Sequence, residues 1–271
     1  QSGTLRANGV GIFNDVSSFT ASGAAVWSIT TSSGIQVNGQ GMVSAGSFKG
    51  DGSLLSGLTK SLNGAAAFTA SGVYNVPAGV TKVLVLVVGG GGGGGGVTGA
   101  AANFGAAGGG GGGGCARDFV DLSGVPNVTV TVSTGANGGA AGNNPGTAAS
   151  PTSFGAYVSA NGGAGGTGQT AGNTYAPVAG GAGGAGASGV LNATGSDGGI
   201  GFRLSGTTGH AGYGGASACA GGGESGPPVA AAAGNNGSNY GGGGSGALST
   251  AGVNQAGGNG APGAVLIWEF E

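Results

Sequence analysis

The sequence has few charged and few aromatic side chains. Charged residues make up 5% and aromatic residues 6% of its 271 residues, and the net charge is −2. A surface laced with ion pairs and a large aromatic core are therefore excluded. No basic stripe is present to neutralise phosphates, which argues against nucleic acids and anionic membrane surfaces as partners.

Long apolar runs are also missing. The longest strongly apolar run covers residues 83–88, far short of the ~20 residues that a membrane-spanning helix needs. The first residues do not form a positively charged, apolar signal peptide. We therefore expect a soluble chain without an export signal.

Cysteine and histidine are scarce. Cys115 and Cys219 are too few for a disulfide scaffold and have no metal-ligand spacing, so no metal or other cofactor is expected. Both stand among glycine and alanine, which predicts small buried hydrophobic residues, with a mutual disulfide as the alternative. His210 is the only histidine. A two-histidine relay is therefore excluded, and we expect a surface or loop position for His210.

Glycine is the residue in excess. The chain has 75 glycines, and residues 1–82 hold only 14 of them, which predicts a boundary near residues 60–68. Ordinary domains contain about 7% glycine. Collagen is excluded because the glycines keep no strict triplet period and proline is rare. A flexible linker is disfavoured because strand-like stretches interrupt the glycine tracts.

Several stretches have the pattern of β-strands, and no segment has a helical pattern. Some are apolar on both faces and others alternate strictly between apolar and polar residues. Residues 76–79, Val-Pro-Ala-Gly, suit a type I turn with proline second and glycine fourth. We predict an all-β fold in which the strands pair into a small base. The strand candidates are residues 67–69, 73–76, 81–88, 128–132 and 264–270.

The glycine tracts lack side chains, so their backbones can approach one another closely. Such a run can form an extended polyproline-II-like helix of about three residues per turn, whose N–H and C=O groups point outward. Buried backbone groups must be paired, so neighbouring rods would bond laterally. We predict a bundle of short polyglycine rods on the β base. The tracts lie at residues 89–96, 108–114, 162–166, 180–186 and 241–244.

The N-terminal part of the chain differs from the rest. Residues 1–60 contain short strand candidates separated by glycine turns, too short to bury a core alone. A segment of this kind usually needs oligomerisation to supply the missing apolar contacts. We therefore divide the chain into an N-terminal segment, residues 1–60, and a glycine-rich domain, residues 61–271.

The order of these features resembles a known family of phage proteins. Residues 68–82, followed by an apolar strand and a glycine tract, are similar to the opening of the glycine-rich domain at the distal end of many bacteriophage tail fibres. Residues 121–139 look like its middle and residues 263–268 like its closing strand. This resemblance covers about residues 66–271, and residues 48–58 resemble a motif common in trimeric fibre shafts.

The resemblance implies an architecture and partners. It implies a homotrimer with a β shaft over residues 1–60, and a tip over residues 61–271 in which a small β-sheet base carries packed polyglycine-II-like rods and loops. The implied partners are a bacterial surface receptor, either a glycan or an outer-membrane protein, and upstream fibre or tail proteins. The implied location is the distal end of the tail fibre of a virion made in the host cytoplasm.

Side chains at the loop tips are the candidate receptor contacts, because glycine rods offer only backbone. Tyrosine and phenylalanine give rigid contact area, and neighbouring Ser, Gly and Asn give adaptable hydrogen bonds. The alternative for each aromatic residue is that it fills a gap between rods. Side chains assigned to packing are Phe154, Tyr157, Trp268 and Phe270. The candidate contacts are Asn103, Phe104, Tyr175, His210, Tyr213, Asn235, Asn236 and Tyr240.

Catalytic motifs are weak. Matches to G-x-G-x-x-G arise by chance in glycine tracts, none opens a helix after a strand, and no G-K-[ST] triplet exists. Glycosidases generally use a pair of carboxylates, and the candidates here are Asp118, Asp121, Asp197 and Glu224. Local pairing, capping or turn chemistry explains the first three. We therefore expect a receptor-binding protein that is not an enzyme. A structural or ice-binding glycine-rich protein and a polysaccharide depolymerase are the alternatives.

Overall fold

The computed structural model describes residues 62–219, 230–250 and 252–270. Contacts divide the chain into two units, Gln1–Gly57 and Leu58–Glu271, and all described residues belong to the second unit. These residues form strands and extended segments without a helix, so they contain no helical membrane span, and the predicted all-β class is confirmed. The predicted shaft over residues 1–60 lies outside the described residues.

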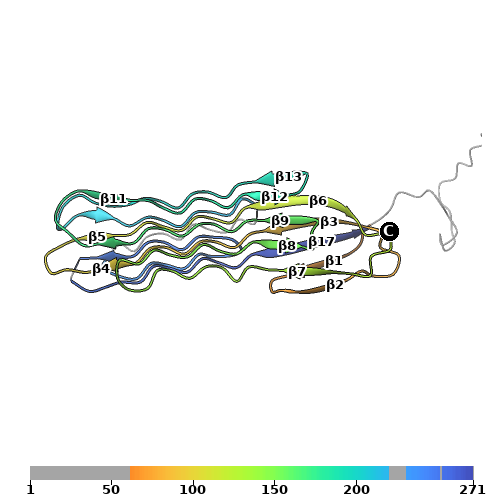
Figure 1. Cartoon of the computed structure of the whole chain (residues 1–271), viewed down its shortest axis with the longest axis horizontal. Coiled ribbons are helices and arrows are strands. Elements are labelled where there is room, and N and C mark those ends of the chain that lie inside the picture. The colour runs from red at the N-terminus through yellow and green to blue at the C-terminus, as the bar shows by residue number, and fades with distance from the viewer. Residues whose placement is uncertain (1–61, 220–229, 251, 271) are drawn as a thin grey trace, which may run out of the picture. The chain divides into compact units, whose positions relative to one another are not determined.

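Two five-stranded antiparallel sheets lie at one end of this unit (Figure 1). The first sheet has the order β1 (Leu62–Phe68), β17 (Ala264–Phe270), β3 (Lys82–Val88), β6 (Cys115–Asp121) and β13 (Leu191–Ala193). The second has the order β12 (Gly186–Ser188), β9 (Val158–Ala160), β8 (Thr152–Phe154), β7 (Asn127–Thr131) and β2 (Gly72–Asn75). The strands predicted at 81–88, 128–132 and 264–270 are thus confirmed as β3, β7 and β17.

The inner faces of the two sheets form the main hydrophobic core. Val83, Val85 and Val87 of β3 are fully buried and belong to one cluster with residues of β7, β8 and β9. Phe154 is fully buried in this cluster, as predicted. Tyr157 is partly exposed, and its ring lies 6.2 Å from that of Phe154. β3 and β17 pair along their whole length, which ties the C-terminal strand into the sheet.

The turn before β3 differs from the prediction. The amide of Val80 donates to the carbonyl of Pro77 at 3.1 Å, so the turn spans residues 77–80 and not 76–79. Gly79 is then the third residue and has a φ of 89°, the positive value that the third position of a type II turn requires. The type I prediction was wrong because it placed proline second, whereas proline opens the turn.

Glycine-rich segments extend from the sheets and lie side by side (Figure 1), with both antiparallel and parallel neighbours. Residues 89–96 lead away from the sheets and residues 107–114 lead back. Their antiparallel pairing is marked by hydrogen bonds from Gly89 to Gly114 and from Gly95 to Gly108. We call these segments the glycine bundle. It consists of residues 89–96, 107–114, 136–139, 145–149, 161–168, 179–185, 195–200, 211–218, 234–239, 241–247 and 256–263.

Backbone hydrogen bonds in the bundle follow a repeat of three residues. Within residues 107–114, successive amides donate to three different segments in turn, and the carbonyls accept from three others. Every amide and every carbonyl of residues 107–114 is paired in this way, as buried backbone groups require. The amides donate to residues 161–167, 196–199 and 241–247, and the carbonyls accept from residues 89–95, 181–184 and 212–218.

This lateral pairing explains where glycine is needed. A Cβ added at Gly111 would lie 2.1 Å from the carbonyl oxygen of Ala182, and one added at Gly112 would lie 2.0 Å from that of Ala216. Residues 179–185 form an outer segment of the bundle. Every third residue in this segment is an exposed alanine, and the glycines between them face neighbouring segments. Central segments therefore need unbroken glycine, and peripheral segments tolerate a side chain at every third position.

Candidate functional site

The segments of the glycine bundle turn at the end away from the two sheets (Figure 1), and we call these turns the loop end. Three small sheets organise it, and their strands come from distant parts of the sequence. The loop end consists of residues 97–106, 140–144, 169–178, 201–210, 230–233, 248–250 and 252–255. The strand pairs are β4 (Val97–Thr98) with β10 (Gln169–Thr170), and β5 (Gly105–Ala106) with β16 (Leu248–Ser249). β14 (Gly201–Arg203) lies between β11 (Ala176–Val178) and β15 (Gly209–His210).

Phe104 anchors the loop end from inside. It is 4% exposed and belongs to a cluster with Ala106, Ala211 and Leu248. Its backbone exchanges two hydrogen bonds with Gly172, at 3.1 and 2.9 Å. Phe104 therefore has the packing role that the sequence left open for each aromatic candidate.

Two polar side chains connect the loops. Gln169 is buried, and its Oε1 accepts from the amide of Ala106 at 2.7 Å while its Nε2 donates to the carbonyl of Ala176 at 2.9 Å. Arg203 donates to the carbonyls of Thr174 and Thr170. It is the only charged side chain among the loop-end residues. Sequence reasoning missed both residues, because a single Gln or Arg among glycines shows no pattern.

The exposed face of the loop end is partly aromatic, and apart from Arg203 its side chains carry no formal charge. Tyr175 is 64% exposed. His210 is exposed and stacks on Phe202, with ring centroids 6.1 Å apart and an interplanar angle of 21°. Asn103 lies half-buried, one residue before Phe104. Leu204 adds an exposed aliphatic side chain that the sequence did not single out.

The remaining candidate contacts lie elsewhere on the glycine bundle. The carbonyl of Tyr213 accepts from the amide of Gly199, which places Tyr213 on the bundle's side. Asn235 and Asn236 lie on another outer segment, and the Oδ1 of Asn236 accepts from the amide of Asn259 at 2.8 Å.

Tyr240 lies at the opposite end from the loops. The next residue, Gly241, bonds to Gly113 and Pro262, which stand near the sheets. The structure thus places Asn103, Phe104, Tyr175 and His210 in the loop end and separates the other four candidates from them.

Two of the candidate carboxylates accept hydrogen bonds from backbone amides. Oδ1 of Asp197 accepts from the amide of Gly183 at 2.8 Å, and Oδ1 of Asp121 accepts from the amide of Ser123 at 2.9 Å. Asp118 lies in β6, and Glu224 falls outside the described residues. Within the described ranges, no three metal-ligating side chains of His, Cys, Asp or Glu come together.

One buried carboxylate was not among the candidates. Glu269 of β17 is buried, and the hydroxyl of Tyr74 donates to its Oε1 at 3.0 Å. Burial, together with the hydrogen bond and the negative charge of Glu269, raises the pKa of Tyr74 well above its ordinary value. The pair lies in the core between the sheets and is structural.

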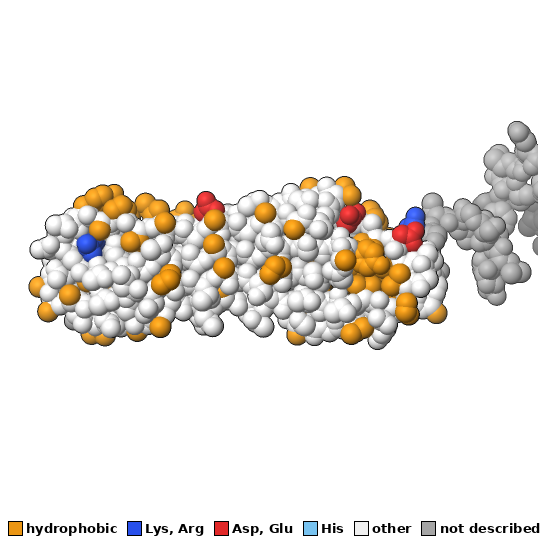
Figure 2. Space-filling view, in the orientation of Figure 1, with side chains coloured by type: hydrophobic (Ala, Val, Ile, Leu, Met, Phe, Trp, Pro, Cys, Tyr) orange, Lys and Arg blue, Asp and Glu red, His pale blue; other side chains and the backbone are white. Residues whose placement is uncertain are grey.

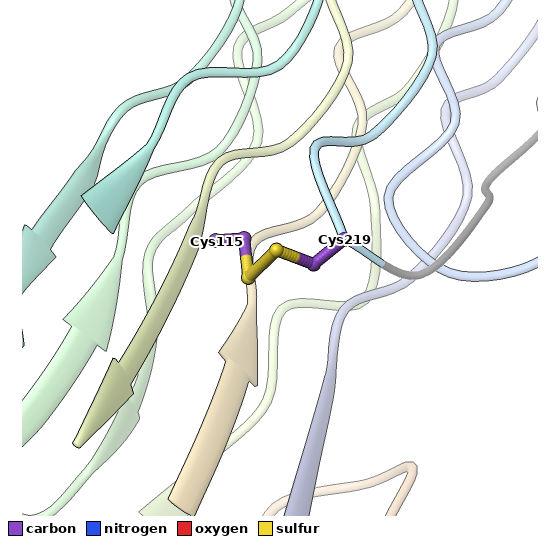
Figure 3. Close-up of a disulfide and its surroundings, with 2 residues drawn as sticks. All are labelled: Cys115 and Cys219. Carbon is purple, nitrogen blue, oxygen red and sulfur yellow. A yellow bond between two sulfur atoms is a disulfide. The ribbon is translucent and has the colours of Figure 1, made fainter. Parts of the chain in front are cut away.

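Cys115 and Cys219 form a disulfide (Figure 3). The expectation of two unlinked, buried hydrophobic residues is therefore wrong. Cys115 opens β6 where a central glycine segment ends, and Cys219 follows Ala218, whose amide donates to the carbonyl of Gly113 at 3.2 Å. Lateral pairing of the segments brings together two cysteines that are 104 positions apart, which sequence spacing cannot show.

Residues 65–268 match a family described as a glycine-rich domain. This range contains the glycine bundle, the loop end and both five-stranded sheets except for the outer ends of β1 and β17. The description says nothing of tail fibres, so it supports only the coarser part of the resemblance. Among curated proteins, none matches this chain.

Proposed function

This chain belongs to the glycine-rich domain family, and we propose that its glycine-rich domain, residues 61–271, is the tip of a bacteriophage tail fibre, because residues 68–82, 121–139 and 263–268 resemble such a tip. The tip binds a receptor on the bacterial surface through its loop end and without catalysis. The observation that carries the proposal is the position of the loops: separate parts of the chain present their side chains together at one end of the bundle.

The scaffold of this tip, in our proposal, is a bundle of polyglycine-II rods. The three-residue cycle of lateral hydrogen bonds supports it, since a rod with about three residues per turn points its backbone groups in three directions. The amides and carbonyls of such rods are hydrogen-bonded to neighbouring rods. Few backbone groups are therefore left to form hydrogen bonds with a receptor. Recognition therefore belongs to the side chains of the loop end.

The loop end is mostly uncharged and partly aromatic, which suits a receptor surface that offers apolar groups and hydrogen-bonding groups. Tyr175 and the stacked pair of Phe202 and His210 offer flat apolar area, and Asn103 offers an amide. Aromatic residues beside small polar ones give rigid contact area at low entropic cost. The receptor is a glycan or an outer-membrane protein of the host.

Assembly and location complete the proposal. Residues 1–60 form the trimeric shaft, upstream fibre or tail proteins join it, and the tip stands at the distal end of the fibre on the virion. Residues 48–58, which are similar to a fibre-shaft motif, support this part.

The deciding experiment compares two tyrosines at opposite ends. Tyr175→Ala is expected to weaken adsorption of the full chain to susceptible bacteria about thirtyfold, since truncating a central aromatic contact commonly costs ~2 kcal/mol. Tyr240→Ala is the matched control and should adsorb normally. Unchanged melting of both variants separates a contact role from a packing role.

Other results would contradict the proposal. Normal adsorption of Tyr175→Ala together with His210→Ala would remove the loop end as the receptor site. Release of reducing sugar from host polysaccharide would favour the depolymerase, and thermal hysteresis without adsorption would favour the ice-binding alternative.

A further inference from the structure

The first sheet has a second apolar face, which points away from the core. We call it the outer face, and its central residues are Leu84 and Leu86 of β3, Phe119 of β6, and Leu266, Trp268 and Phe270 of β17. They alternate with core residues along each strand and are partly or largely exposed. Phe119 is 65% exposed and its ring lies 6.0 Å from that of Phe270.

The second sheet has a polar outer face, as expected for a sheet face that is exposed to solvent. In β7, Val128 and Val130 point into the core, whereas Thr129 and Thr131 alternate with them and are exposed. Strands that are apolar on both faces are typical of sheets covered on both sides. The outer face of the first sheet therefore has the composition of a covered surface.

The outer face also contains two shallow hollows. One hollow of about 400 Å³ is bordered by Leu62, Trp268 and Phe270, and a second of about 350 Å³ is bordered by Phe119 and Leu191. Leu84 and Arg117 border both hollows. Figure 2 shows hydrophobic side chains gathered near the end of the unit that carries the two five-stranded sheets. Most of the visible surface of the glycine bundle is backbone or other uncharged groups.

The charged side chains of this face have both signs. Lys82 lies opposite Asp121 in the register of β3 and β6, and Arg117 lies opposite Leu86. Asp118 lies opposite the core residue Val85 and is on the other side of the sheet. A mostly apolar face with charges of both signs suits a partner of the same composition, such as a second copy, better than a strongly acidic or strongly basic partner.

We propose that the outer face is the surface through which copies of this chain pack against one another. The inference rests on the association of copies proposed above and assigns it a surface. Leu62, the first described residue, borders a hollow of this face, so the described unit begins at this face. If copies are joined by their N-terminal residues, their outer faces are at a high effective concentration with respect to one another. This favours packing between these faces.

The test uses the full chain. It measures the molecular mass in solution and the protection of outer-face side chains from chemical modification. Light scattering gives the mass at micromolar concentration. Hydroxyl-radical footprinting gives the modification of Phe119 and Tyr175, each relative to the unfolded chain. The two side chains are almost equally exposed in a single copy, at 65% and 64%, so a bare face predicts similar native-to-unfolded ratios. A covered face predicts a several-fold lower ratio for Phe119.

Matched variants complete the test. Leu191→Asp should dissociate the oligomer or raise the modification of Trp268, whereas Ile200→Asp, at a similar exposure away from this face, should change neither. An oligomer in which Phe119 is as reactive as Tyr175 would overturn the assigned surface while keeping the association. A monomeric chain would overturn both.

Discussion

At the scale of single residues, glycine is required where a neighbouring backbone occupies the place of a Cβ. At Gly110 that atom would lie 2.2 Å from the carbonyl oxygen of Gly92. Ala182, in contrast, is exposed although its own carbonyl pairs with the amide of Ala164. Glycine is therefore required at position 110, whereas position 182 accepts a side chain.

We expect Gly110→Ala to destabilise the protein by about 1–3 kcal/mol, because the added methyl group must displace a packed backbone. Ala182→Ser is the control, since its side chain faces solvent, and it should stay within about 0.5 kcal/mol of wild type. Denaturant unfolding measures both variants. Equal stability of the two would show that the segment around Gly110 is loosely packed.

Tyr74 gives a pH dependence of known sign. Its pKa is raised in the folded protein, so the unfolded chain loses the phenolic proton first as the pH rises. The contribution of protonated Tyr74 to the free energy of unfolding is fully present below about pH 10. It is lost above that pH, by up to about 1.4 kcal/mol per pH unit. Urea unfolding between pH 8 and about pH 11.5 should show this decline.

Tyr74→Phe tests the assignment of this pH dependence. The variant removes the hydrogen bond to buried Glu269 and should cost about 1–3 kcal/mol at neutral pH. The loss of stability above about pH 10 should become shallower in this variant. A decline as steep as that of wild type would assign it to other groups.

At the scale of elements, strands and glycine segments are continuous with one another. β3 runs directly into residues 89–96, and residues 107–114 run directly into β6, so the sheets set the starting positions of the central segments. The disulfide lies at this junction and ties β6 to the end of residues 211–218. The sheets thus hold the ends of the glycine segments in place, and the disulfide adds a covalent link at this junction.

Removing the disulfide should therefore loosen this junction. For a closed loop of this length the expected loss is about 3–5 kcal/mol, on the model that a crosslink constrains the unfolded chain. Melting of the Cys115→Ser, Cys219→Ser double variant against the oxidised wild type measures it. Identical melting of reduced and oxidised wild type would show that lateral hydrogen bonds alone hold the junction.

At the scale of the described unit, the bundle behaves as one hydrogen-bonded body. Each central segment is held by several others, so opening one segment breaks hydrogen bonds to all of them. Cooperative opening of this kind has a high free energy, whereas loops with few partners open easily. The loop end, with its short strands, is expected to be the least protected part.

Hydrogen exchange checks this expectation. Amides of residues 107–114 should exchange as slowly as those of β3, because both sets are buried and fully paired. Amides of residues 204–208 in the loop end serve as the fast reference. Rapid exchange throughout residues 107–114 would indicate a flexible linker in place of packed segments.

The amino-acid sequence by itself determined the strands and the need for close backbone packing. β-branched and alternating residues predict β3, β7 and β17, because side-chain periodicity is a local property. Unbroken glycine predicts backbones in contact, because only glycine leaves that space free. The family resemblance also rested on these local features.

The tertiary structure alone decided which segments are neighbours. Glycine has no side chain that could encode a partner, so the arrangement around residues 107–114 depends on where the sheets start each segment and where the loops return it. The disulfide between Cys115 and Cys219, the burial of Phe104 and the distance of Tyr240 from the loop end all follow from that arrangement. Each depends on contacts between residues far apart in the chain, which no local pattern records.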